Sequence, residues 1–214
     1  MYSAASIPIY RYLVSLLIIS VVLVSSASAD VRSVRSLLEM RQEGVVMQEW
    51  DLSCGAATLT TLLRYQHGDP VTEKEVATAL INRDRYLQNP ILVRLNHGFS
   101  LLDLKRYADS RGYNGVGLGR MALEDLVRRA PVIVPISVRG YNHFVIFRGQ
   151  LGDRVLLADP NWGNRTMTVT QFEDAWIEFP RIGHVGFVVE GKDLVAGHSA
   201  GLLSPQAQDF PTLN

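Results

Sequence analysis

The apolar pattern of the chain changes near residue 130, and this change limits the possible folds more than any other feature of the sequence. Before it, apolar residues recur at the spacing of one helix face, and helices are expected over residues 31–41, 54–65, 72–81, 101–110 and 122–129. After it, short apolar runs separated by turn residues predict strands near residues 132–138, 143–148, 154–158, 166–169 and 184–189. Helices followed by strands indicate an α+β domain with two segregated halves.

Residues with strong capping preferences indicate where these helices begin and end. Ser53 is expected to cap a helix that begins at Cys54. The capping-box pattern, a hydroxyl residue followed three positions later by an acidic one, occurs at Thr72–Glu75 and again at Ser100–Asp103. The helix that begins at Cys54 should end within residues 67–70 (HGDP), because glycine and proline interrupt helical backbone.

The strand half contains one unusual residue, Pro135, inside the run 132–138. Proline lacks the amide hydrogen that a central strand donates, so it predicts an edge strand or a bulge. The short spacer 149–153 is typical of an antiparallel hairpin. We therefore expect the strands that begin at His143 and Arg154 to pair with each other.

Residues 1–29 have the pattern of a secretory signal peptide. Arg11 precedes the apolar run 13–24, and Ala27–Ala29 forms an A-x-A cleavage pattern before Asp30. The apolar run is shorter than the roughly 20 residues of a spanning helix. We therefore expect cleavage and a periplasmic location; the alternative is an uncleaved segment that anchors the protein in the inner membrane.

The rest of the chain divides into a domain and a tail. Residues 30–190 hold the expected helices and strands, and 47% of the whole chain is hydrophobic, enough for a core. Residues 191–214 are mostly small and polar, and we expect a flexible C-terminal tail. Because 21 basic residues balance 21 acidic ones, the charge does not indicate a nucleic-acid partner.

The single cysteine, Cys54, is the first candidate for chemistry. One cysteine allows no intrachain disulfide, and a lone thiol in an exported protein is either buried and inert or kept for its reactivity. A helix N-terminus favours a thiolate, since its unpaired amides attract negative charge. Gly55 would leave room for a substrate backbone. An inert thiol is the alternative, because free cysteine is among the most buried residue types.

His143 and Asp159 are the candidates to assist the thiol. His143 begins an apolar strand, where an imidazole can act as general base. Asp159 ends the strand expected to pair with it, so its carboxylate can orient the imidazole, although Asp-Pro also begins turns for local reasons. The other histidines have weaker cases, in turns, loops, a strand start or the tail: His67, His97, His184 and His198.

Gln48, upstream of Cys54, is a candidate to stabilise an oxyanion. A side-chain amide there can join a backbone amide in binding the oxygen of a tetrahedral intermediate. The alternative is an exposed loop glutamine. No histidine or cysteine pair has the spacing of metal ligands, and no phosphate-binding glycine loop is present, so we expect neither a metal nor another cofactor.

These candidates occur together and in a specific order. Gln48-x5-Cys54-Gly55, His143-Phe144-Val145-Ile146 and Asp159-Pro160-x-x-Gly163 resemble the bacteriocin-processing, double-glycine leader family of cysteine peptidases. Phe172 and Trp176 look like the F-x-x-x-W helix of that family. The chain departs from the family at Ser53, where most members carry aspartate. As a standalone exported protein, it looks similar to the periplasmic peptidases encoded with functional-amyloid (Fap) secretion systems.

The resemblance implies a papain-like fold in which an N-terminal helical half packs on a C-terminal antiparallel sheet. It implies that Cys54 is the nucleophile, His143 the base and then the acid, Asp159 the orienting group and Gln48 the oxyanion donor. Asn142 and Trp162, which lie in or beside the matching motifs, would contact the substrate together with Gly55. The implied substrate is a secreted protein or peptide, cut after a Gly-Gly or similar small pair; amyloid subunits or their export machinery are candidate partners.

Two other functions are compatible with the same residues. A non-catalytic module of the same fold would bind peptides in support of secretion, and Ser53 in place of aspartate favours this reading. A transglutaminase-like acyl transferase would use the same Cys–His–Asp order. The oxyanion candidate Gln48 and the Asp-Pro-x-x-Gly context favour the peptidase.

Overall fold

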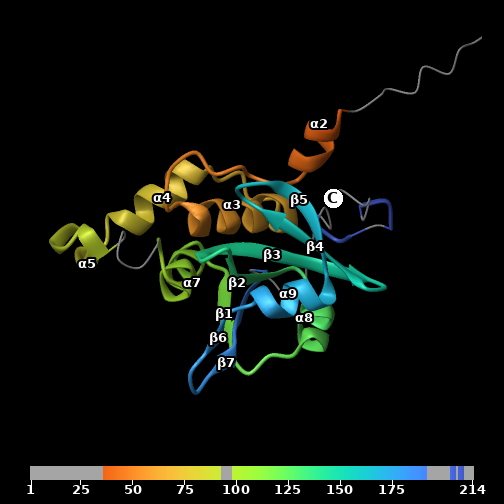
Figure 1. Ribbon diagram of the computed structural model, residues 1–214. Coiled ribbons are helices and arrows are strands. Elements are labelled where there is room, and N and C mark those ends of the chain that lie inside the picture. The colour runs from red at the N-terminus through yellow and green to blue at the C-terminus, as the bar shows by residue number, and fades with distance from the viewer. Residues whose placement is uncertain (1–35, 93–97, 192–202, 206, 210–214) are drawn as a thin grey trace, which may run out of the picture. The chain divides into compact units, whose positions relative to one another are not determined.

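An antiparallel sheet of six strands, in the order β1–β8–β2–β3–β4–β5, organises the domain (Figure 1). The structure is a computed structural model that describes residues 36–92, 98–191, 203–205 and 207–209. The strands are β1 (Asn114–Leu118), β2 (Val132–Val138), β3 (Tyr141–Leu151), β4 (Arg154–Asp159), β5 (Gly163–Thr168) and β8 (Gly186–Glu190). A separate small hairpin is made of β6 (Glu178–Phe179) and β7 (Gly183–His184).

Helices cover both faces of this sheet (Figure 1). In the described part of the chain, the helices that precede the first strand are α2 (Leu37–Gln42), α3 (Cys54–His67), α4 (Glu73–Ile81), α5 (Asp84–Gln88) and α7 (Leu101–Ser110). On the other face lie α8 (Leu123–Arg129) and α9 (Val169–Ala175), and a 3₁₀ turn, η1, covers Ala207–Asp209. Within the described ranges, no helix has the length and apolar character needed to cross a membrane.

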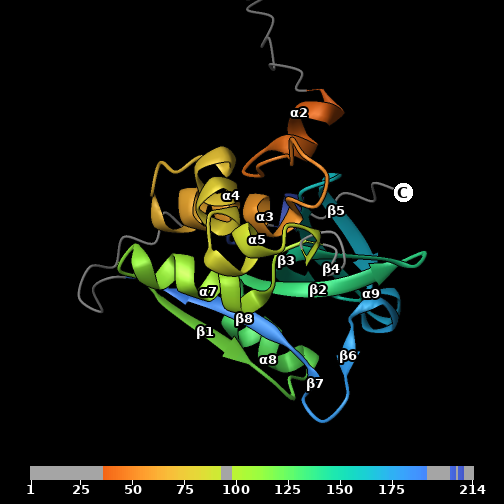
Figure 2. The ribbon, with the colours of Figure 1, turned by 90° about the vertical axis from the view of Figure 1, so that its left-hand side faces the viewer.

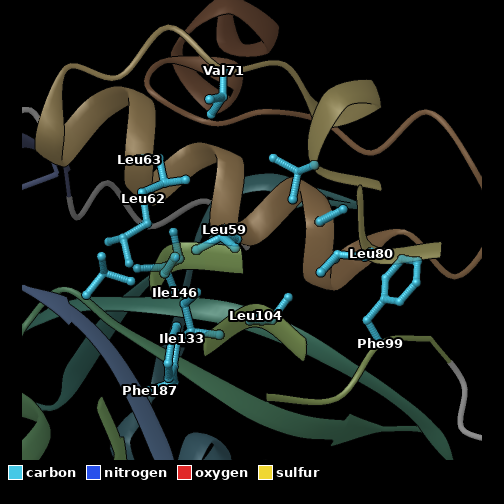
Figure 3. Close-up of a cluster of buried hydrophobic side chains, with 14 of the residues drawn as sticks. Leu59, Leu62, Leu63, Val71, Leu80, Phe99, Leu104, Ile133, Ile146 and Phe187 are labelled. Carbon is cyan, nitrogen blue, oxygen red and sulfur yellow. The ribbon is translucent and has the colours of Figure 1, made fainter. Parts of the chain in front are cut away.

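Two hydrophobic clusters, one on each face of the sheet, hold the layers together. The first lies between α3, α4, α7 and the sheet and includes Leu59, Leu62, Leu104, Ile133 and Ile146 (Figure 3). The second lies under α8 and α9 and includes Leu126, Val134, Val145, Phe147 and Phe172. Alternate residues of β2 and β3 therefore serve opposite clusters, as the strand period requires. Each fully buried large side chain stabilises the fold by about 1.5–3 kcal/mol.

The helix boundaries agree with the expected capping residues. Both capping boxes form, at Thr72–Glu75 and at Ser100–Asp103. Helix α3 begins at Cys54 and ends at His67, and the C-cap residue Gly68 adopts the left-handed conformation (φ 69°) that suits glycine. Ser53 occupies the N-cap position of α3, but its side chain makes no capping hydrogen bond.

Pro135 lies in an interior strand, which corrects the expectation of an edge strand or bulge. β2 pairs with β3 along its whole length, but with β8 only at Ile133 and Phe187. Beyond that point Pro135 faces Ile177, whose N–H donates to the Pro135 carbonyl at 3.1 Å. The absence of an amide hydrogen at Pro135 is tolerated because β8, the strand that would accept it, does not extend to this position.

Strand β1 (Asn114–Leu118) has no counterpart among the expected strands. It lies beside β8 and against α7 (Figure 2). The ammonium of Lys105 donates to the Gly115 carbonyl at 2.7 Å, and the Gly115 amide donates to Asp109 at 3.0 Å. A Cβ at Gly115 would approach the Phe187 ring to 3.0 Å, so glycine permits this close packing.

Part of the expected flexible tail is anchored to the domain. Leu203 is fully buried in the first cluster, and its carbonyl accepts a hydrogen bond from Nε of Arg148 at 3.0 Å. Pro205 lies directly over Gly149 of β3. The remainder of the tail lies mostly outside the described residues, as does the expected signal peptide, residues 1–29.

Candidate active site

Cys54 is the first residue of α3 and is almost completely buried, with 1% of its surface exposed. Burial has the largest influence on its thiol and raises the pKa; hydrogen bonds from the backbone amides of Phe144 and Gly55 act in the opposite direction. The contact with Phe144 matters because it brings the thiol beside β3, next to His143. The helical half therefore places Cys54 beside the first residues of β3.

His143 and Asp159 are brought together by the β3–β4 hairpin, as expected from the sequence. The two strands pair in antiparallel register, with Ile146 opposite Ala158. This register places the end of β4 beside the start of β3, and Nε2 of His143 lies 3.1 Å from Oδ2 of Asp159. Both side chains are buried, at 4% and 0% exposure. The carboxylate can therefore fix the ring orientation and tautomer of the imidazole.

The second ring nitrogen of His143 is available for chemistry. Nδ1 is buried and has no hydrogen-bond partner among the described residues. A buried imidazole nitrogen without a partner is costly in an inert protein. Here it belongs to a ring that lines the same cavity as Cys54. With Nε2 donating to Asp159, Nδ1 carries the lone pair that a general base needs.

Asp159 is held ionised by its surroundings. Burial, the largest influence, raises the pKa of its carboxyl, but the hydrogen bond from His143 and the charge of Arg165 outweigh it and hold the pKa below its ordinary value. The other carboxylate oxygen, Oδ1, accepts the amide hydrogen of Asn161 at 2.9 Å. Both oxygens are therefore engaged, which keeps the carboxylate in one orientation.

Gln48 is tied to the same region through its backbone. Its amide donates to the carbonyl of Pro160 at 2.9 Å, one residue after Asp159. The side-chain Nε2 donates to Trp50 at 3.3 Å, while Oε1 is buried and has no partner among the residues that the structure describes. The oxyanion role of Gln48 stays a prediction.

A cavity of about 530 Å³ opens at Cys54 and His143. Its walls are mostly apolar and come from both halves of the domain; they include Phe99, Leu101, Leu102, Phe144, Phe179 and Ile182. Arg85 supplies a positive charge to the lining. The space suits a peptide that passes over the thiol with apolar side chains against the walls.

The three expected substrate contacts occupy different positions. Asn142 lines the cavity. Gly55 is buried, and a Cβ there would lie 3.4 Å from the Phe144 ring. Trp162 is 57% exposed, is not among the described residues that line the cavity, and has the guanidinium of Arg41 over its ring at 5.2 Å. The substrate roles of these three residues stay predictions.

Three residues near the site were missed by sequence reasoning. The Tyr141 ring stacks on His143 with 5.4 Å between centroids. Nε of Arg165, on β5, lies 3.0 Å from Oδ2 of Asp159. Glu73, on α4, accepts hydrogen bonds from the loop that precedes Cys54. Tyr141 could have been found, because it is two residues before His143 on one strand face; the other two depend on tertiary packing. In the described ranges, no group of three or more His, Cys, Asp or Glu side chains is placed to hold a metal ion.

Comparisons with known proteins agree with this geometry. A family model described as the peptidase C39 family matches residues 42–179. The probable functional amyloid protease FapD of Pseudomonas aeruginosa is 36% identical over 154 residues, which are 71% of this chain and 66% of that protein. FapD of Pseudomonas fluorescens is 38% identical over 148 residues, or 68% and 62%. The matches thus span slightly less than two thirds of each relative's length.

Two solved structures share the fold. A double glycine motif protease from an AMS/PCAT transporter, solved with its leader peptide, gives a TM-score of 0.53 at 23% identity and covers 70% of this chain and 94% of its own. The peptidase domain of Streptococcus ComA, a bifunctional ABC transporter, gives 0.54 at 15% identity and covers 70% and 99%. These likenesses confirm the predicted α+β, papain-like fold.

Proposed function

Because the chain belongs to the peptidase C39 family, we propose that it is an exported cysteine endopeptidase with Cys54 as its nucleophile. The observation that carries the proposal is the cavity that Cys54 and His143 share, with Asp159 holding the far side of the imidazole. A peptide carbonyl in this cavity meets a thiol from the helical half and a base from the sheet.

Acylation is the first half of the proposed reaction. Nδ1 of His143 accepts the thiol proton of Cys54 while the sulfur attacks the carbonyl carbon of the scissile bond. The carbonyl oxygen becomes an oxyanion, which accepts hydrogen bonds from the Cys54 amide and the Gln48 side chain. The imidazolium, still hydrogen-bonded to Asp159, then donates its proton to the leaving nitrogen as the C–N bond breaks.

Deacylation reverses these roles with water. A water molecule attacks the thioester carbon while His143 accepts one of its protons. The C–S bond breaks, the sulfur regains the proton from His143, and the carboxylic acid product leaves. The protein ends the cycle in the protonation state in which it began.

The substrate that we propose is a secreted protein, cut after a Gly-Gly or similar small pair. The relatives in Pseudomonas are named functional amyloid proteases, which supports a fibre subunit or its export partner as the substrate. One structural neighbour is named for a double glycine motif, which supports the small pair. The apolar walls at Phe99, Leu101 and Phe144 are suited to apolar side chains of the substrate.

Export to the periplasm is part of the same proposal. It is supported by the order of positive charge, apolar run and small residues within residues 1–29.

The experiment that tests the function compares cells carrying the wild-type gene with cells carrying Cys54→Ala. Mass spectrometry of secreted proteins should find new N-termini after small-residue pairs only in the wild type. Circular dichroism of purified Cys54→Ala verifies folding, and Ser110→Ala, at an exposed residue of α7, is the matched control.

The other functions give different outcomes in the same experiment. Unchanged processing by Cys54→Ala would contradict the peptidase and favour a peptide-binding module. Cross-linked or amidated products that depend on Cys54 would indicate acyl transfer in place of hydrolysis.

A further inference from the structure

Residues 48–53 form a tight loop that leads into the nucleophile. Its last residue, Ser53, donates its backbone N–H to the carbonyl of Trp50 at 3.3 Å, and Cys54 follows directly as the start of α3. Leu52 has a φ of 68°, in the left-handed region that residues with a side chain rarely adopt. Such a backbone persists only where the surrounding structure holds it.

Glu73, the first residue of α4, holds this loop from outside. It is buried, with 4% of its surface exposed. Its Oε2 accepts the backbone N–H of Glu49 at 3.0 Å, and its Oε1 lies 2.5 Å from Oγ of Ser53. A single carboxyl group thus connects the beginning of the loop with its end.

The hydrogen atoms available to Ser53 indicate how this contact works. Its hydroxyl carries one hydrogen, yet Oγ lies 2.7 Å from the Trp50 carbonyl and 2.5 Å from the carboxyl of Glu73. That one hydrogen can serve the Trp50 carbonyl or the Glu73 carboxylate, so the hydroxyl ties both acceptors to the end of the loop. Burial has the largest influence on the Glu73 carboxyl and raises its pKa, while the hydrogen bonds from Ser53 and the Glu49 amide act in the opposite direction.

We propose that Glu73 is a positioning residue for the oxyanion hole. By connecting Glu49 and Ser53, it holds the loop so that Gln48 and the Cys54 amide address the same carbonyl oxygen. The contacts of Glu73 described above are with Glu49 and Ser53, so it acts through the loop and not on the substrate. The inference rests on the proposed function, in which Cys54 is acylated through an oxyanion.

Two reactions of Cys54 can distinguish a variant with a misplaced oxyanion hole from a variant that is generally misfolded. Acylation by p-nitrophenyl acetate passes through a tetrahedral oxyanion, whereas alkylation by iodoacetamide does not. Neither reagent requires the natural substrate, so the ratio of the two rates can be measured even if the peptide specificity proposed above is wrong.

Glu73→Ala should lower the acylation rate by about tenfold or more, with the alkylation rate within about twofold of the wild type. Glu73→Gln should retain most of both rates, because its amide can accept from Glu49 and donate to Ser53. The matched control is Glu75→Gln on the same helix, whose side chain reaches Thr72 and not the loop; it should leave both rates unchanged.

Gln48→Ala tests whether the effect of Glu73 on acylation passes through Gln48. It should lower acylation like Glu73→Ala, and the double variant should be little worse than Gln48→Ala alone, since both changes remove one function. The proposal is overturned if Glu73→Ala acylates at the wild-type rate, if both reactions fall alike, or if Glu73→Gln loses as much as Glu73→Ala. Peptide cleavage that is absent from the wild type would count against the proposed function alone.

Discussion

Nε of Arg165 lies 3.0 Å from Oδ2 of Asp159. The two residues are on adjacent antiparallel strands, β5 and β4, so the sheet itself fixes their separation. His143 contacts the same oxygen from the other side of the pairing, on β3. Partners on both neighbouring strands therefore favour the ionised form of Asp159, in addition to the Asn161 amide on its other oxygen.

We predict that Arg165→Gln moves the acidic limb of the pH–activity profile to higher pH. Removing the guanidinium takes away one cause of the lowered pKa of Asp159, so the carboxyl gains its proton at a higher pH. A carboxyl with a lowered folded pKa stabilises the fold above its unfolded pKa, and this contribution is lost as the pH falls. The variant should therefore also lose thermal stability earlier on acidification.

The measurement is kcat/KM and the melting temperature as functions of pH. Arg106→Gln, at an exposed position of α7, is the control and should leave the profile in place. An acidic limb that stays where it is in Arg165→Gln would mean that His143 and the Asn161 amide keep Asp159 ionised without the guanidinium.

A second prediction concerns the reactivity of Cys54 in the free protein. Because burial raises the pKa of its thiol, alkylation by iodoacetamide should titrate above the pH typical of a free cysteine. At neutral pH the reaction then needs His143 as a base. His143→Ala should slow it about 100-fold at neutral pH, and the two proteins should react alike in strong alkali.

His184→Ala is the control for that prediction, because His184 lies at the end of the short strand β7 and is not among the described residues that line the cavity at Cys54. Its alkylation profile should match the wild type. A thiol that titrates well below the ordinary range would contradict the prediction and indicate a preformed thiolate–imidazolium pair.

The parts of the site that the sequence predicts are those fixed by local rules. Cys54 at a helix start follows from the capping and breaker residues around 54–70. The pairing of His143 with Asp159 follows from one hairpin, since only Gly152 and Asp153 separate β3 from β4. In both cases neighbours in the chain determine the geometry.

The parts that could not be predicted depend on contacts between distant segments. Glu73 looks like an ordinary acidic residue in the first turn of a helix, and only the docking of α4 on the loop 48–53 buries it. Arg165 lies in β5 but precedes the strand expected at residues 166–169, because the polar residues at the start of β5 give no strand pattern. Strand β1 is rich in glycine and forms because α7 and β8 hold it.

A third prediction concerns the anchored part of the C-terminal segment. Leu203→Ala removes a side chain that is fully buried in the core and should reduce the free energy of unfolding by about 2–5 kcal/mol. The measurement is the midpoint of denaturant unfolding. Leu151→Ala, at a side chain that is 49% exposed, should change stability by less than about 0.5 kcal/mol. Equal effects of the two changes would mean that the segment beyond residue 191 adds nothing to the fold.

The last prediction concerns Ser53, the position at which most members of the family carry aspartate. In this chain Oγ of Ser53 lies 2.5 Å from Oε1 of Glu73, so an aspartate would set a second carboxyl against the first. Two carboxyls at this separation cannot both ionise. Ser53→Asp must therefore hold an extra proton or push the loop away from α4, and we expect a loss of about 2–4 kcal/mol in stability.

A double-mutant cycle tests whether Glu73 is the cause. In a Glu73→Gln background the like charge is absent and the amide can donate to the new aspartate, so Ser53→Asp should cost at least about 1 kcal/mol less than in the wild type. Ser53→Ala, which removes the hydroxyl without adding charge, should cost about 1 kcal/mol in the wild type. Identical costs of Ser53→Asp in both backgrounds would show that the two side chains do not interact in solution. A coupling of the expected sign would instead mean that Glu73 prevents this chain from accepting the family's usual residue beside the nucleophile.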